Sequence, residues 1–83
     1  MALVLAPTRE LCLQIKEYFD RFIEAGINHF TAICIHGGVD PMKQVIEMSK
    51  KPSVIVSTPG RLLDHLTNTK GFNLNNLKYL ILD

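Results

Sequence analysis

Four short apolar runs, separated by helix-like patterns, constrain the fold of this chain more than any other feature. The runs cover residues 2–6, 30–35, 53–57 and 79–83 and are rich in Val, Ile and Leu. Segments that are apolar at nearly every position are typical of parallel strands that are buried on both faces. The sequence therefore predicts an α/β fold in which a parallel sheet is flanked by helices.

Three amphipathic patterns lie between these runs, over residues 11–23, 40–49 and 58–67. In each, apolar residues recur every three or four positions, which is typical of a helix with one buried face. The side chains expected to face the core are Leu11, Ile15, Phe19, Phe22 and Ile23 in the first pattern, Met42, Val45 and Ile46 in the second, and Leu62, Leu63 and Leu66 in the third. Strands that alternate with helices across short joints predict βαβ units and a doubly wound sheet in one domain.

The residues with unusual chemistry all end or directly follow the predicted strands. In doubly wound sheets, ligands bind outside the carboxyl ends of the strands, so these residues are the candidate site. They are Pro7, Thr8, Arg9 and Glu10 after the first run, Gly37 and Gly38 after the second, Thr58, Pro59, Gly60 and Arg61 after the third, and Asp83 at the end of the fourth. One edge of the sheet is thus predicted to hold every candidate residue.

Two of these strand ends share a threonine, a proline and an arginine at the start of a helix. Thr8 and Thr58 suit the N-cap position, where the side chain accepts from a first-turn amide, and Pro59 suits the first helical position. An arginine in the first turn opposes the helix dipole, so Arg9 and Arg61 are explained better if an anion docks there. The residues leave two interpretations open at each corner, a structural cap and a phosphate-binding site.

The other candidates also have a structural and a functional interpretation. Gly37 and Gly38 either form a turn before the next helix or leave the backbone open to a ligand. Asp83 either belongs to a turn or holds a hydrated Mg²⁺. The three histidines lack the spacing of a metal site and are interpreted as surface or packing residues.

The overall charge limits how the chain can bind a polyanion. The formal net charge is +1, so binding of nucleic acid has to come from individually placed groups rather than from bulk attraction. Cys12 and Cys34 lie in apolar stretches and are expected to be buried thiols in a reducing compartment. No run resembles a signal peptide or a membrane span, and no segment matches the phosphate-binding loop G-x-x-x-x-G-K-[ST].

The ordered set of motifs resembles one known family. Pro7-Thr8-Arg9-Glu10-Leu11, Gly37-Gly38, Thr58-Pro59-Gly60-Arg61 and Leu82-Asp83 occur in the order and approximate spacing of DEAD-box RNA helicases. The resemblance covers essentially the whole chain. It implies that residues 1–83 are the central part of the first of two RecA-like domains, a P-loop NTPase fold that is expected to be truncated at both ends. Residues 65–74 also resemble the nucleolar, rRNA-processing branch of that family.

The resemblance implies a role for each matching residue. Pro7, Thr8 and Arg9 match the first RNA-backbone motif, Gly37 and Gly38 match the glycine pair that lies against RNA, and Thr58, Pro59, Gly60 and Arg61 match the second RNA-backbone motif. The helix that follows Thr58 is similar to the one that bends the bound strand. Asp83 matches the first Asp of the D-E-A-D signature, which holds Mg²⁺ beside ATP. Cys12 replaces the usual Ala of the family and is still expected to pack.

The resemblance further implies that a full-length parent uses ATP and Mg²⁺ to close two RecA-like domains on single-stranded or duplex RNA, and so unwinds short duplexes. Such a parent is expected in the nucleus or nucleolus, or otherwise in the cytoplasm, with no membrane partner. The Q motif, the phosphate-binding loop, the Glu that positions the attacking water and the second RecA-like domain are missing from these 83 residues. The chain alone is therefore predicted to lack ATPase activity.

Two other functions fit the residues less closely. One is a module that binds RNA or a protein partner without hydrolysing ATP, as a truncated or degenerate relative would. The other is an unrelated small α/β protein that binds one phosphorylated metabolite. That protein would need an acidic cluster or a nucleophile at the carboxyl edge of the sheet, and the sequence predicts neither. A segment of an RNA helicase is therefore the leading interpretation.

Overall fold

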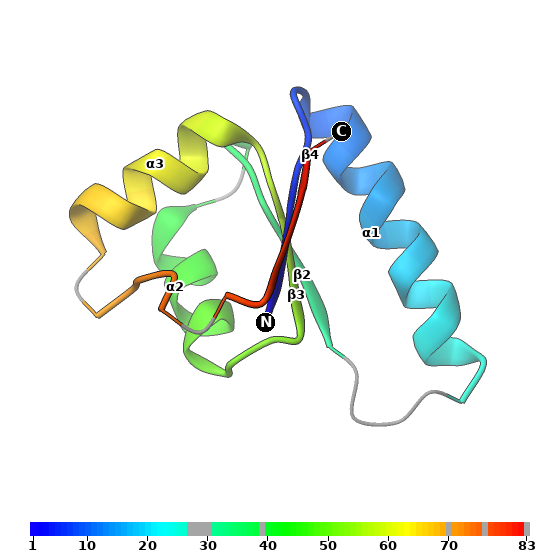
Figure 1. Cartoon of the computed structure of the whole chain (residues 1–83). Helices are drawn as coiled ribbons and strands as arrows, with labels where there is room; N and C mark the ends of the chain where they lie inside the picture. Colours follow the sequence, from blue (N-terminus) through cyan, green and yellow to red (C-terminus); the bar gives the residue numbers. More distant parts are fainter. Residues whose placement is uncertain (27–30, 39, 70, 76, 83) are drawn as a thin grey trace.

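The computed structural model describes all residues except 27–30, 39, 70, 76 and 83. Along the described chain the elements are β1 (Ala2–Leu5), α1 (Arg9–Glu24), β2 (Ala32–Ile35), α2 (Pro41–Ser49), β3 (Val54–Ser57), α3 (Pro59–Asn68) and β4 (Tyr79–Leu82). All strand pairs are parallel, and the strand order is β2-β3-β1-β4. Helix α1 covers one face of the sheet, and α2 and α3 cover the other (Figure 1). The predicted parallel sheet with flanking helices is confirmed.

The two inner strands, β1 and β3, are apolar at nearly every position because both faces of the sheet are covered there. The core beneath α1 consists of Val4, Ala6, Cys12, Val54 and Val56. The core on the side of α2 and α3 consists of Leu3, Ile35, Ile55 and Leu62. Successive residues of β3 thus alternate between the two cores, as the two-residue period of a strand requires. The expected burial of β1 and β3 on both faces is confirmed.

Helix α1 follows its prediction closely. It ends at Glu24, with Ala25 as the C-cap residue, and Gly26 follows at a φ of +98°. That φ lies in the left-handed region that glycine adopts without a Cβ penalty, so Gly26 ends the helix as expected. Phe22 is a departure, because its side chain is exposed rather than directed into the core.

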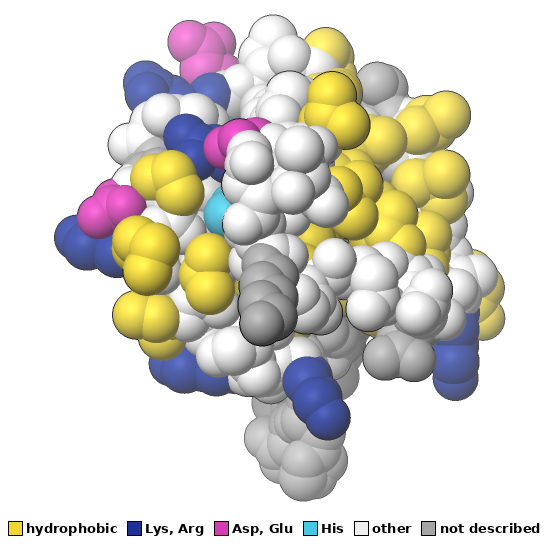
Figure 2. Space-filling view, turned by 90° about the vertical axis from the view of Figure 1, so that its left-hand side faces the viewer, with side chains coloured by type: hydrophobic (Ala, Val, Ile, Leu, Met, Phe, Trp, Pro, Cys, Tyr) yellow, Lys and Arg dark blue, Asp and Glu magenta, His cyan; other side chains and the backbone are white. Residues whose placement is uncertain are grey.

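Helices α2 and α3 turn different side chains inward from those predicted. Met42, Ile46 and Leu63 are exposed, and Leu66 is also exposed although less so. Figure 2 shows the side of the molecule on which these helices lie, with apolar side chains at the surface among charged ones. The expectation that these four residues face the core was wrong. The physical reason is that polar side chains, Gln44 and His65, occupy inward positions on the two helices.

Strand β4 lies at an edge of the sheet and is apolar without being buried. It pairs only with β1, and the side chains of all its residues, Tyr79–Leu82, are exposed. The inference from apolar composition to burial on both faces was therefore wrong for this strand, because none of the described helices covers it. Phe30 and Asp83, which were predicted to belong to strands, lie outside the described residues.

The helices of the described ranges are all too short or too polar to cross a membrane.

Candidate nucleic-acid interface

The carboxyl ends of the three neighbouring strands β2, β3 and β1 lie side by side and bring most of the candidate residues to one edge. The backbone N–H of Ala6 donates to the carbonyl of Ser57 at 3.0 Å, and the N–H of Thr58 donates to the carbonyl of Ile35 at 3.1 Å. These bonds join the first residue after β1 to the end of β3, and the first residue after β3 to the end of β2. The predicted edge is therefore formed by residues 7–10, 37–38 and 58–61, whereas Asp83 lies outside the described residues.

The first corner is a capped helix start. Thr8 is the N-cap of α1, and its hydroxyl accepts a hydrogen bond from the N–H of Leu11 at 3.2 Å. Glu10 in the first turn suits the positive end of the helix dipole. Arg9, the first residue of the helix, opposes that dipole and is exposed. The structural interpretation of Thr8 is thus confirmed, and it leaves the position of Arg9 unexplained.

The second corner has the same composition and a different cap. Thr58 is the N-cap of α3 and Pro59 its first residue, but the Thr58 hydroxyl accepts no hydrogen bond from the first turn. The expected side-chain cap at Thr58 was therefore wrong. The amides of Gly60 and Arg61 lack a partner from that side chain, so this helix start is better suited than α1 to receive an anion.

Both arginines reach the Gly37–Gly38 turn. A Cβ built on Gly38 would lie 2.6 Å from Nη1 of Arg9, and a Cβ built on Gly37 would lie 3.8 Å from Nη2 of Arg61. A real Cβ would not lie as close as 2.6 Å to another atom. Arg9 can occupy this position over Gly38 because Gly38 has no side chain. The structure thus joins the two corners through the glycine pair, which sequence reasoning had placed only on the same edge.

The positive charge at this turn is only partly neutralised. Arg61 has a side chain that is 13% exposed, and its nearest recorded carboxylate is Asp64, at 3.7 Å from Nη1 to Oδ2. Among the described residues, no carboxylate pairs with Arg9. Burial, followed by the charges of Arg9 and Arg61, lowers the pKa of His36, which lies at the same turn. The turn is therefore electropositive and chemically suited to phosphate.

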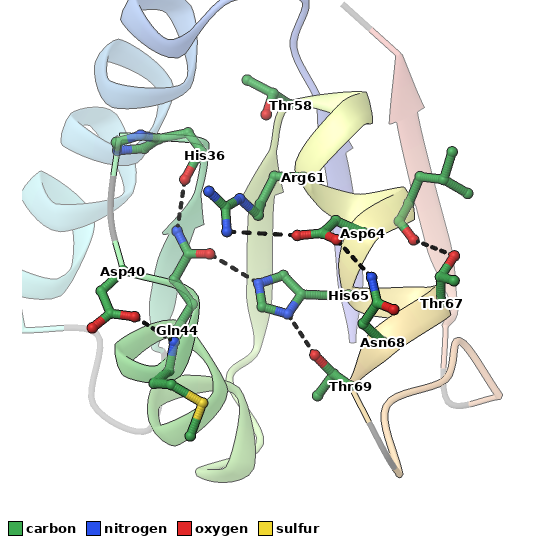
Figure 3. Close-up of polar contacts among 12 residues, drawn as sticks. His36, Asp40, Gln44, Thr58, Arg61, Asp64, His65, Thr67, Asn68 and Thr69 are labelled. Carbon is green, nitrogen blue, oxygen red and sulfur yellow. Dashed lines mark hydrogen bonds and ion pairs between the residues drawn. The ribbon is translucent and has the colours of Figure 1, made fainter.

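Three polar residues behind the turn form a buried network that sequence reasoning missed. Gln44 and His65 are each about 2% exposed or less, and they are hydrogen-bonded to one another and to the backbone of His36 (Figure 3). The interpretation of His36 and His65 as packing residues is confirmed by their burial. One feature of the sequence could have pointed to Gln44: it is a polar residue between apolar positions of an amphipathic helix.

The two cysteines contribute packing rather than chemistry. Cys12 is fully buried and Cys34 is half-buried, and both are free thiols. Burial raises the pKa of Cys12, and burial followed by the neighbouring Cys12 raises the pKa of Cys34 to about 12. Both side chains are therefore protonated near neutral pH and weakly nucleophilic.

The described residues do not by themselves provide a site for a divalent metal. They contain no group of three His, Cys, Asp or Glu side chains close enough to hold an ion. Asp83, the residue predicted to hold Mg²⁺, lies outside them.

Comparison with known proteins decides the family. A family model described as DEAD/DEAH box helicase matches residues 1–83, the whole chain. The chain belongs to the DEAD/DEAH box helicase family. The RecA-like fold predicted for this helicase segment is supported by the solved structure of the yeast DEAD-box splicing factor Prp28. That structure matches with a TM-score of 0.83 and 32% identity, over 99% of this chain and 19% of Prp28.

Curated relatives of the helicase segment agree with the narrower resemblance. ATP-dependent rRNA helicase rrp3 of Schizosaccharomyces pombe is 56% identical over 82 residues, which are 99% of this chain and 17% of the relative. Probable ATP-dependent RNA helicase DDX47 of Homo sapiens is 54% identical over 82 residues, which are 99% of this chain and 18% of the relative. The segment thus spans less than a fifth of the length of these helicases, and two predictions are confirmed: the DEAD-box family and the resemblance to rRNA helicases.

Proposed function

We propose that the chain is the central part of one RecA-like domain of an ATP-dependent RNA helicase, and that it contacts the sugar-phosphate backbone of RNA. The observation that carries this proposal is the convergence of Arg9 and Arg61 on the Gly37–Gly38 turn. Guanidinium groups bind phosphate through two parallel N–H donors, and two of them beside an open backbone suit a chain of phosphates. The names of the relatives, which are RNA helicases, support RNA as the polyanion.

The roles of the individual residues follow from where they lie. The residues proposed to contact RNA are Pro7, Thr8, Arg9, Gly37, Gly38, Thr58, Pro59, Gly60 and Arg61. The glycines let the RNA strand approach the protein backbone, the arginines bind phosphates, and the uncapped amides at the start of α3 donate hydrogen bonds to a further phosphate. The rigid start of α3 at Pro59 would then contact the bound RNA strand and bend it.

The remaining parts of the reaction are proposed for the full-length parent. ATP supplies the free energy for closing two RecA-like domains on the RNA, with Asp83 helping to hold Mg²⁺ and the second RecA-like domain completing the ATP site. The resemblance to rRNA helicases supports a nuclear or nucleolar location. This segment contributes part of the RNA-binding surface, and closure of the two domains completes that surface.

Binding through the backbone predicts little dependence on RNA sequence. Unrelated single-stranded RNAs of equal length should bind the full-length parent with affinities that agree within about 3-fold, because phosphate contacts carry no base information. The measurement is filter binding, in parallel with RNA-stimulated ATPase activity. Affinities that differ by about 100-fold between sequences would contradict backbone binding, and a parent without ATPase activity would instead be a binding module.

Gly60 offers a direct test of close approach by RNA. A Cβ at Gly60 would meet nothing within 4 Å, and alanine is more stable than glycine in a helix by about 0.5–1 kcal/mol. Gly60→Ala is therefore expected to leave the melting temperature of the parent unchanged or higher. We expect it to weaken RNA binding by about 5-fold or more, or roughly 1 kcal/mol, because the added methyl group would stand where the strand lies.

Gly71 provides the matched control for that substitution. It also has open space around it, but its φ of +84° strains any other residue. Gly71→Ala should lower the melting temperature and leave RNA affinity unchanged. If Gly60→Ala binds RNA as tightly as the unaltered parent, Gly60 is not part of the interface.

A further inference from the structure

The buried network behind the glycine turn connects three elements through side chains. Nε2 of Gln44 in α2 donates to the carbonyl of His36 at 2.9 Å, and Oε1 of Gln44 lies 2.9 Å from Nε2 of His65 in α3. Nδ1 of His65 lies 2.7 Å from the hydroxyl of Thr69, just beyond α3. Figure 3 shows these contacts in sequence from the end of β2 to the end of α3. Every polar atom of Gln44 and His65 side chains therefore has a partner.

The chemistry of the partners fixes the direction of each bond. The His36 carbonyl can only accept, so the amide nitrogen of Gln44 faces it and the amide oxygen faces His65. Nε2 of His65 must then carry a hydrogen, and Nδ1 accepts from the Thr69 hydroxyl in the neutral ring. Burial, followed by the charge of Arg61, lowers the pKa of His65, which favours that neutral form.

The network reaches the candidate RNA contacts at both of its ends. His36 directly precedes the Gly37–Gly38 turn, and its Nδ1 accepts from the N–H of Gly38 at 3.0 Å. His65 lies four residues after Arg61, so both side chains lie on the same face of α3. Among the hydrogen bonds recorded for the described residues, the contact between Gln44 and His65 is the one that joins α2 to α3 through side chains. It therefore fixes the turn relative to the helix that carries Arg61.

We propose that Gln44 and His65 are positioning residues that hold the Gly37–Gly38 turn and Arg61 in the geometry that binds the RNA backbone. This inference rests on the proposed function of that site. Apolar side chains could fill the same space without fixing the positions of their neighbours, whereas an amide and an imidazole accept only a narrow set of positions for their partners. The ring of His65 is further held by an edge-to-face contact with Phe72, at 6.3 Å between centroids.

The test uses the full-length parent and compares substitutions that keep or remove the bonds. Gln44→Met keeps the length of the side chain and removes the amide, and His65→Leu removes the ring nitrogens. Each is expected to raise the Kd for single-stranded RNA by about 3- to 10-fold, the range for one lost hydrogen bond. In RNA-stimulated ATPase assays the loss should appear in the KM for RNA, with kcat at saturating RNA changed by less than about 2-fold.

Rescue and matched controls separate positioning from stability. His65→Gln restores a donor toward Gln44 and should return the Kd to within about 2-fold of the unaltered parent. Gln14→Met makes the same chemical change at an exposed position of α1 and should have no effect. If Gln44→Met does not fold, the double variant Gln44→Met with His65→Leu replaces both partners by apolar groups, so that no ring nitrogen is left facing an apolar side chain, and it should also raise the Kd by about 3- to 10-fold.

The outcomes distinguish this inference from the proposed function. If Arg61→Ala weakens RNA binding while the folded Gln44 and His65 variants bind normally, the inference is overturned and the proposed function stands. It is also overturned if His65→Gln binds RNA no better than His65→Leu. If Arg61→Ala leaves RNA affinity unchanged, the proposed function fails and this inference fails with it.

Discussion

Replacing Arg9 and Arg61 together by alanine is expected to weaken the binding of single-stranded RNA to the full-length parent by about 100-fold, at roughly 1.4 kcal/mol for each guanidinium. The two side chains approach one turn from different helices, so each can bind its own phosphate. Arg61→Ala alone should account for about 10-fold of this loss. The affinity for ATP should stay unchanged, because both arginines are proposed to bind RNA only.

The dependence on salt makes this prediction specific. Each phosphate contact on a single strand contributes about 0.7 to the slope of log affinity against log salt concentration, so the double variant should lose about 1.4 from that slope. Filter binding at several salt concentrations measures it. Arg21→Ala is the matched control, because Arg21 lies in the last turn of α1 and pairs with Glu17 at 3.8 Å. A double variant with an unchanged slope would show that these arginines do not bind phosphate.

The isolated 83-residue chain is expected to self-associate at concentrations of about 10 µM and above, rather than to melt cooperatively as a monomer. Strand β4 presents an unpaired edge and four exposed apolar side chains, Tyr79–Leu82, to solvent. Such an edge is a template for pairing with another chain. Light scattering after gel filtration, together with thermal melting followed by circular dichroism, would measure both properties.

Charged substitutions can show whether β4 causes this association. Leu80→Lys with Leu82→Lys places two charges on the edge strand and should shift most of the isolated chain to the monomer. Leu63→Lys with Leu66→Lys adds the same charges to exposed positions of α3 and should not prevent association. A sharp cooperative melt of the monomeric, unaltered chain would contradict the prediction.

The sequence was sufficient to predict the sheet and the edge that carries the candidate site. Strongly apolar runs and helical spacing are local patterns, and the chemistry-bearing residues directly follow the strands, so their common edge follows from parallel topology alone. The same local patterns gave wrong predictions of side-chain burial where that burial depends on elements far away in the sequence. Leu63 and Met42 have helical spacing, yet they are exposed because Gln44 and His65 lie between α2, α3 and the sheet.

The geometry within the site could not be predicted from the sequence. Thr8 and Thr58 each lie next to a proline at the start of a helix, and only Thr8 caps its helix through its side chain. The approach of Arg9 to Gly38 joins residues that are far apart in the chain, and it depends on the order of the strands and on side-chain rotamers. The network of Gln44 depends in the same way on three elements meeting behind one turn.

The position of β1 at the centre of the sheet has a mechanical consequence for the proposed helicase. Ala2–Leu5 is paired along its whole length with Val54–Ser57 on one side and with Tyr79–Leu82 on the other. β1 leads to the Arg9 corner, and β4 leads toward Asp83, the proposed magnesium ligand. Neither strand can slide without breaking its hydrogen-bonded ladder, so the proposed RNA contacts and the proposed magnesium ligand are expected to move together as parts of one rigid sheet. If the parent is the proposed helicase, changes in RNA affinity during its ATP cycle are therefore expected to come from the motion of whole domains.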